Sequence, residues 1–206
     1  HKNIEISQMA TDIISNQYEL SENWKKHGIF TDTEDVHLKL AVERHATSKI
    51  FHEKDLFNIK TLGFRGEALA AIASVSHFEL LTCDDEKNGA NRIFLKGGIV
   101  DKFGRVGFPK GTKITVKRLF FNTPARLKFL KTDTTELHHI QQHIVQKALA
   151  NPHIHFRLTS NSRLLLNLPG GQKLVDRIQK LFGEEFKNNL MMIKHEETYL
   201  KFSGFI

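Results

Sequence analysis

The element that most constrains this chain is a glycine-rich turn that enters a helix. Residues 62–66 read Leu62-Gly63-Phe64-Arg65-Gly66, and the alanine- and leucine-rich run that follows predicts a helix over 67–74. Glycine lets backbone N–H groups close around an anion, and Arg65 adds a positive charge between the two glycines. Taken alone, this pattern favours an ordinary surface turn, because short glycine spacings are weak signals. A phosphate site at the loop-to-helix junction is the competing interpretation, and it depends on the strings around the turn.

Three other strings stand in a fixed order around this turn. His45-Ala46-Thr47-Ser48-Lys49-Ile50 precedes it, and its hydroxyls and lysine are groups that bond phosphate oxygens and the water ligands of a metal. Lys110-Gly111-Thr112 opens a strongly β-prone segment, and its threonine could reach the same cleft. Arg118–Arg126, with the letters RLFFNTPAR, joins that segment to a short helix opened by Pro124.

Hydrophobic periodicity predicts helices in the first part of the chain and a mixture of strands and helices after residue 77. The predicted strands cover residues 78–83, 91–95, 111–121, 154–159 and 163–168, and the predicted later helices cover 134–149 and 173–182. The second half is therefore expected to be α+β, with a strand–helix–strand unit of the split βαβ kind. A domain boundary is expected between residues 102 and 111.

Charge and composition narrow the function classes. The chain has 206 residues, of which 40% are hydrophobic and 26% charged, as expected for a globular protein. One cysteine, Cys83, excludes an intramolecular disulfide, and no apolar run is long enough to cross a membrane. The net charge of +7 raises the expectation of a polyanionic partner, and the lysine and arginine density over 110–131 suggests backbone contacts to duplex DNA. Solvated surface lysines are the alternative for that segment.

Taken together, the strings resemble one known family. RHATSKI, LGFRGEALAAIASVS, LFFNTPARLKFL and the following TELHHI are similar, in order and spacing, to the N-terminal portion of MutL-type DNA mismatch repair proteins, from about Arg44 to the end of the sequence. The resemblance implies an α+β fold of the GHKL ATPase superfamily. A GHKL-type α/β sandwich would cover 1–105, with an incomplete or diverged N-terminal part. A transducer-like domain with a βαβ unit would cover 106–206 and be truncated at its C-terminal end.

The resemblance also implies which residues surround a nucleotide. The site would take ATP, with magnesium offsetting the charge of the phosphates. The HATSK string would contribute to the nucleotide site, the turn before the helix would hold the phosphates as a lid, and the GT string would lie near the base. These residues are Thr47, Ser48 and Lys49, then Gly63, Phe64, Arg65, Gly66, Glu67, Ala68 and Leu69, and finally Thr112.

The first 43 residues depart from the family pattern. Glu19-Leu20-Ser21-Glu22-Asn23 resembles the family's catalytic helix, which would make Glu19 the general base and Asn23 a magnesium ligand. The family's adenine-binding turn, Asp-x-Gly-x-Gly, does not occur in the sequence before Gly63, since Gly28 is the only glycine there. In a second register Gly28-Ile29 ends the adenine turn, and the catalytic glutamate would then lie upstream of His1. Two explanations stay open: residues of the family pattern are not part of this sequence, or the chain has lost nucleotide chemistry.

The expected function is that of a mismatch repair protein whose N-terminal region binds and weakly hydrolyses ATP. Nucleotide would drive homo- or heterodimerisation and couple it to DNA and to a mismatch-recognition protein of the MutS type. The expected location is the cytoplasm of a bacterium or the nucleus of a eukaryote, with no membrane partner. The alternative is a nucleotide-independent DNA-binding or dimer-partner module on the same scaffold.

Overall fold

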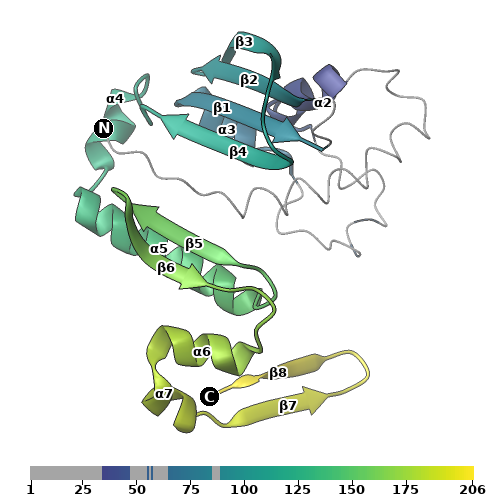
Figure 1. Cartoon of the computed structure of the whole chain (residues 1–206), viewed down its shortest axis with the longest axis vertical. Helices are drawn as coiled ribbons and strands as arrows, with labels where there is room; N and C mark the ends of the chain where they lie inside the picture. Colours follow the sequence, from purple (N-terminus) through teal and green to yellow (C-terminus); the bar gives the residue numbers. More distant parts are fainter. Residues whose placement is uncertain (1–33, 47–54, 56, 58–64, 85–88) are drawn as a thin grey trace. The chain divides into compact units, whose positions relative to one another are not determined.

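A computed structural model describes residues 34–46, 55, 57, 65–84 and 89–206 of the chain. The chain divides into two compact units (Figure 1). The first consists of residues 1–131 with 159–164, and the second of residues 132–158 with 165–206. The predicted domain boundary between 105 and 106 falls at the end of one strand of the first unit, and it stays a prediction.

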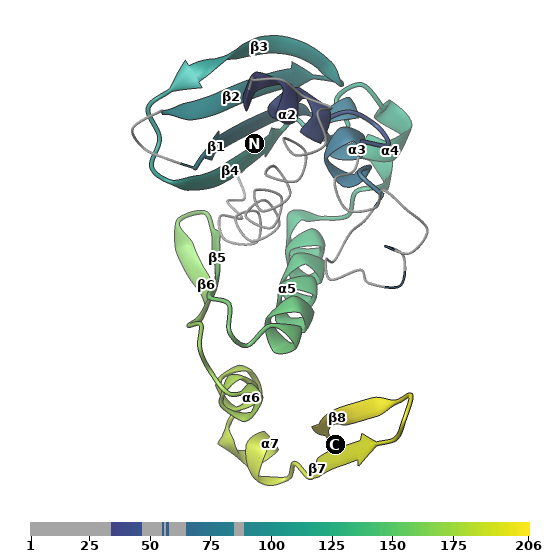
Figure 2. The same cartoon turned by 90° about the vertical axis from the view of Figure 1, so that its right-hand side faces the viewer.

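The first unit is built on a four-stranded antiparallel sheet in the order β3-β2-β1-β4 (Figure 2). Its strands are β1 (His77–Cys83), β2 (Ala90–Lys96), β3 (Ile99–Val106) and β4 (Gly111–Lys117). Strand β3 was not predicted from the sequence. It follows β2 through a two-residue turn, Gly97-Gly98, whose φ angles of 60° and 86° suit glycine and a tight hairpin.

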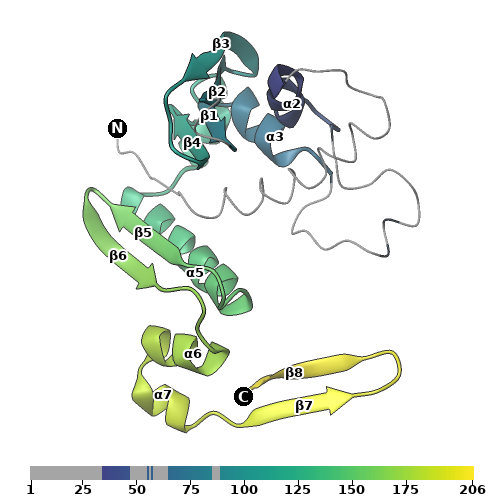
Figure 3. The same cartoon turned by 45° about the vertical axis from the view of Figure 1, so that its right-hand side comes forward.

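Two helices, α2 (Glu34–Ala41) and α3 (Ala68–Ser74), cover one face of this sheet (Figure 3). The strands alternate, so that Phe78 and Leu80 of β1 point to the same side and are almost fully buried. Leu38 of α2 and Ala73 of α3 pack against them. The buried core of the unit therefore lies between the helices and this face of the sheet, and Ile93 and Leu95 of β2 complete it.

The prediction of a strand from 111 to 121 was wrong at its C-terminal end. Strand β4 stops at Lys117, because Arg118 and Phe120 adopt left-handed φ angles of 51° and 63° that no strand contains. The amide of Phe121 donates to the carbonyl of Arg118, which closes a turn. Pro124 then opens α4 (Pro124–Phe129), a helix without a single buried residue.

The remaining elements of the chain are helices and two small antiparallel sheets, and the tip of one of these sheets, residues 159–164, belongs to the first unit. Helix α5 begins after Thr132, whose side chain accepts a hydrogen bond from the amide of Thr135. Strands β5 and β6 pair with each other, whereas β4 belongs to the sheet of the first unit, so α5 connects strands of different sheets. The elements are α5 (Asp133–Ala150), β5 (Phe156–Ser160), β6 (Arg163–Leu168), α6 (Leu174–Phe182), α7 (Glu184–Asn188), β7 (Met192–Glu196) and β8 (Lys201–Phe205).

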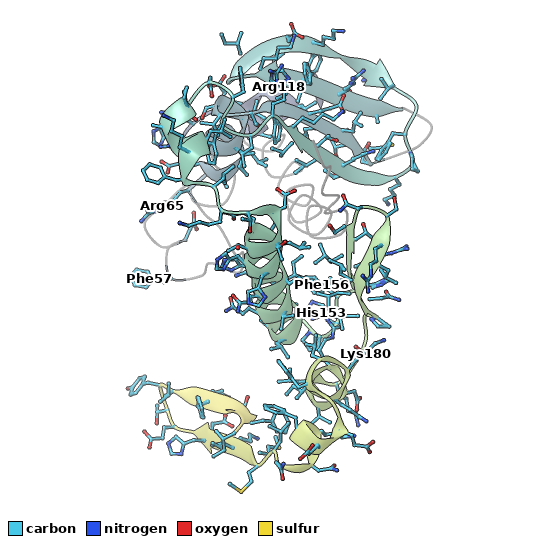
Figure 4. The ribbon with its side chains drawn as sticks, turned by 90° about the vertical axis from the view of Figure 1, so that its left-hand side faces the viewer. Phe57, Arg65, Arg118, His153, Phe156 and Lys180 are labelled. Carbon is cyan, nitrogen blue, oxygen red and sulfur yellow. The ribbon has the colours of Figure 1, made fainter. Side chains whose placement is uncertain are left out.

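The second unit contains a buried charged side chain. Arg177 of α6 is fully buried, and burial lowers the pKa of its guanidinium. Its donors reach backbone carbonyls of Ala148, Pro152, Ile154 and Pro169 and the side-chain oxygen of Gln172. The guanidinium also lies 5.8 Å from the ring centroid of Phe156, which Figure 4 shows beside α5. One side chain thus ties together the end of α5, the segment before β5 and the segment after β6.

The mixture of helices and antiparallel sheets confirms the predicted α+β class. Within the described residues, no helix is long and apolar enough to cross a membrane.

Candidate functional site

Seven of the predicted site residues lie outside the part of the chain that the structure describes. They are Glu19, Asn23, Thr47, Ser48, Lys49, Gly63 and Phe64. The predicted base and the predicted magnesium ligand therefore stay predictions. The described part of the candidate site consists of the second half of the glycine-rich turn, the start of α3, and Thr112.

The turn before α3 has the backbone that its sequence predicts. Gly66 has a left-handed φ of 65°, a conformation that costs a non-glycine residue strain. Arg65 is exposed, and Glu67 is the N-cap residue of the helix without a side-chain capping bond. Ala68 is exposed in the first turn of α3, whereas Leu69 packs against the core of the first unit. Leu69 therefore anchors the helix to the sheet.

A salt bridge joins two of the sequence strings. Nδ1 of His45, from the HATSK string, lies 3.0 Å from Oε1 of Glu67 at the start of α3. The side chains are 79% and 50% exposed, so the pair contributes little free energy of its own. His45 also has a left-handed φ of 63°, which is unusual outside glycine. The end of the segment that follows α2 is thus brought beside the entry of α3.

Thr112 is buried at the start of β4. It lies opposite Thr82 in the register of β1 and β4, and the two hydroxyl oxygens are 3.0 Å apart. The side chain of Thr82 points to the same face of β1 as those of Phe78 and Leu80, which α2 and α3 cover. The hydroxyl pair therefore lies on the helix-covered face of the sheet. The turn, the helix entry and Thr112 belong to the same side of the sheet.

The described groups have the chemistry of one end of an anionic ligand site. Arg65 supplies positive charge, Gly66 permits close backbone approach, and the paired threonines offer hydroxyls. These groups fit a phosphate ester better than a metal ion. Among the described residues, no group of three or more His, Cys, Asp or Glu side chains could hold a metal.

Two residues near the site were not predicted as members of it. His45 belongs to the HATSK string, but nothing in that string indicates that Glu67 is its partner. Thr82 carried no sequence signal, because its relation to Thr112 depends on the register of two strands that are far apart in the chain.

Comparisons with known proteins agree on one family for most of the chain. The chain is 44% identical over 180 residues to the DNA mismatch repair protein MutL of Halothermothrix orenii, which covers 87% of this chain and 27% of that protein. It is 48% identical over 167 residues to the MutL protein of Anoxybacillus flavithermus, covering 81% and 27%. The chain thus spans about a quarter of the length of these relatives.

Solved structures of MutL ATPase domains are also similar to this chain, and a family model matches its N-terminal segment. The structure matches the Aquifex aeolicus MutL ATPase domain complexed with ADP, with a TM-score of 0.56 and 31% identity over 70% of this chain and 56% of that one. A second structure of the Aquifex domain, described as from a mismatch repair endonuclease, matches with a TM-score of 0.55 and 28% identity over 76% and 56%. Residues 1–52 match a family model described as a domain of unknown function, DUF8430.

Proposed function

Most of this chain is a MutL-family N-terminal region, and from that premise we propose that it binds ATP with magnesium and hydrolyses it weakly. The observation that carries the proposal is the turn at Gly66, which enters α3 on the same side of the sheet as Thr112. A relative with this fold is described as complexed with ADP, which supports a nucleotide as the ligand.

Each predicted residue has a role in this proposal. The hydroxyls of Thr47 and Ser48 and the ammonium of Lys49 bind phosphate oxygens. The backbone amides of the turn from Gly63 to Leu69, with Phe64 and Arg65 among its residues, hold the phosphates. Thr112 lies near the base. Asn23 holds magnesium, which offsets phosphate charge when bound.

Glu19 would act as the general base that accepts a proton from the attacking water. The chemistry of phosphoryl transfer asks mainly for positioning and charge stabilisation, so most of the contribution of the chain is to hold and orient groups. If the second register applies, the base lies upstream of His1 and Glu19 has no catalytic role.

Nucleotide binding is tested by replacing the glycine with a left-handed φ. Gly66→Val should abolish binding of a fluorescent ATP analogue, because valine at φ 65° is strained and its side chain crowds the backbone amides. Gly171→Val is the matched control, since Gly171 has a φ of 70° in the second unit with open space around it. Unaltered binding by the Gly66 variant would contradict the proposal.

A second function, binding to the DNA backbone, is favoured by one specific observation. Residues 102–131 contain nine lysines and arginines and no acidic residue. The exposed residues of this segment, at the end of β4, in the following loop and on and after α4, include Lys117, Arg118, Arg126, Lys128 and Lys131. Such a segment suits the phosphates of a duplex, as expected for a partner in mismatch repair.

We further propose that nucleotide drives dimerisation, which couples the chain to DNA and to a mismatch-recognition protein of the MutS type. A nucleotide-independent module on the same scaffold is the alternative. Binding of DNA by a Gly66→Val variant that has lost nucleotide would favour that alternative.

A further inference from the structure

The C-terminal end of α3 is held by two loops of the first unit. A helix leaves its last carbonyls without partners inside the helix, and these carbonyls need donors from elsewhere. The side chain of Asn122 donates through Nδ2 to the carbonyl of Ser74, at 2.9 Å. The amide of Phe120 donates to Val75 at 2.7 Å, and the amide of Gly97 donates to Ser76 at 3.0 Å. The loop after β4 and the β2–β3 turn therefore satisfy three consecutive carbonyls, of the last residue of α3 and the two residues that follow it.

Asn122 is exposed, and the β2–β3 turn lies on one side of its side chain. A Cβ atom at Gly97 would lie 3.0 Å from Nδ2 of Asn122 and 3.4 Å from the ring of Phe121. The ring of Phe121 lies edge-on to that of His77, with centroids 4.7 Å apart. A side chain at position 97 would therefore crowd the amide of Asn122, which donates to the carbonyl of Ser74.

The loop that carries Asn122 has a strained backbone. Arg118 and Phe120 both have left-handed φ angles, which cost free energy in residues other than glycine. This conformation presents the amide of Phe120 to Val75 and the side chain of Asn122 to Ser74. Two residues later the same loop becomes α4, since Thr123 is the N-cap residue of that helix.

We infer that Asn122 is a positioning residue that fixes the C-terminal end of α3 and links its position to α4. The inference rests on the proposed function, in which the turn before α3 holds phosphates. Helix α3 has only seven residues, so a displacement of its first turn also displaces Ser74, its last residue. Nucleotide bound at the entry of α3 would then stabilise α4 through the hydrogen bond from Asn122 to Ser74.

Hydrogen exchange of the whole chain tests this link without and with nucleotide. Asn122→Asp keeps the size of the side chain but replaces the donor by a carboxylate that faces a carbonyl. Without nucleotide, the variant should speed exchange of the α3 amides of Ala71 and Val75 by about fivefold or more, as expected for one lost hydrogen bond. With saturating ADP, wild-type chain should show slower exchange in α3 and at the amides of Leu127 and Leu130. In the variant, ADP should slow exchange in α3 alone.

Matched variants separate positioning from general destabilisation. Asn188→Asp makes the same chemical change at an exposed residue of the second unit and should leave both helices unaffected. Gly97→Ala should reproduce the Asn122 variant, whereas Gly98→Ala should not, because its Cβ meets Ser74 only at ordinary contact distances of 3.4 Å or more. Both alanine variants carry the strain of a left-handed φ, so wild-type exchange of the β1 and β2 amides is expected of the two asparagine variants.

The possible results decide separate questions. Unchanged α3 exchange in Asn122→Asp without nucleotide overturns the inference, as does an α4 response to ADP that survives the substitution. Faster exchange throughout the sheet would assign Asn122 to stability alone and also overturn it. A wild-type chain that binds no ADP contradicts the proposed nucleotide function. The nucleotide-free comparison then still decides whether Asn122 positions α3.

Discussion

The hydroxyl oxygens of Thr82 and Thr112 lie 3.0 Å apart in neighbouring strands, and both residues are buried. A hydroxyl has one proton to donate and can accept two hydrogen bonds. One of the two threonines therefore donates to the other, and the acceptor keeps its own proton for a further partner. The remaining proton can be donated to a ligand on the helix-covered face of the sheet.

The first prediction follows from this pair. Thr112→Val should lower the free energy of unfolding by about 1–3 kcal/mol, because it leaves the buried hydroxyl of Thr82 without its partner. The double variant Thr82→Val with Thr112→Val removes both hydroxyls and should cost less than the sum of the two single changes. Denaturant unfolding of the four proteins measures the coupling.

The same proteins test the ligand role of Thr112. If Thr112 lies near the base of a nucleotide, the double variant should remain folded but bind ADP more weakly than wild type. Purely additive unfolding free energies would contradict the hydrogen bond, and wild-type affinity would contradict the ligand role.

The sequence predicted local features better than relations between distant strands. Helix α3 was found because the alanine- and leucine-rich run after Gly66 has no competing signal. Strand β3 was missed, because the three charged residues and the one glycine of residues 99–106 hide the alternation on a strand that is exposed along much of its length. The strand over 111–121 was predicted too long, since no propensity indicates that Arg118 and Phe120 adopt left-handed angles. Those angles are stabilised by tertiary contacts to the end of α3, and only the structure reveals these.

The second prediction concerns the proposed base. Glu19→Ala should keep ATP binding and lose turnover, because a general base stabilises the transition state more than the ground state. Glu22→Ala, a carboxylate of the same string, is the control and should keep both properties. Turnover and binding of a fluorescent ATP analogue are measured on the same preparations. Wild-type turnover by the Glu19 variant would favour the register in which the base lies upstream of His1.

The third prediction concerns Arg177, whose guanidinium is satisfied by carbonyls and by the side-chain oxygen of Gln172 rather than by a carboxylate. Arg177→Met should lower the free energy of unfolding of the second unit by about 3 kcal/mol or more, since several buried carbonyls lose a charged donor. Arg177→Lys should rescue little, because an ammonium cannot span the same set of acceptors. Lys180→Met on the exposed side of α6 is the control. Equal stability of the Arg177 and Lys180 variants would show that the buried network contributes nothing.

The last prediction concerns the basic segment from 102 to 131. If it binds the backbone of a duplex, phosphate contacts release counterions, and affinity should fall with salt at a log–log slope of about −0.9 per phosphate contacted. Arg126→Ala and Lys128→Ala should each reduce the magnitude of that slope by about one and weaken all sequences alike, because phosphate contacts carry no sequence information. Lys173→Ala, an exposed lysine outside the segment, should leave the slope unchanged. Filter binding over a range of salt measures all four proteins. Absence of binding at about 50 mM salt, or affinity that is indifferent to salt, would mean that these side chains only keep the surface solvated.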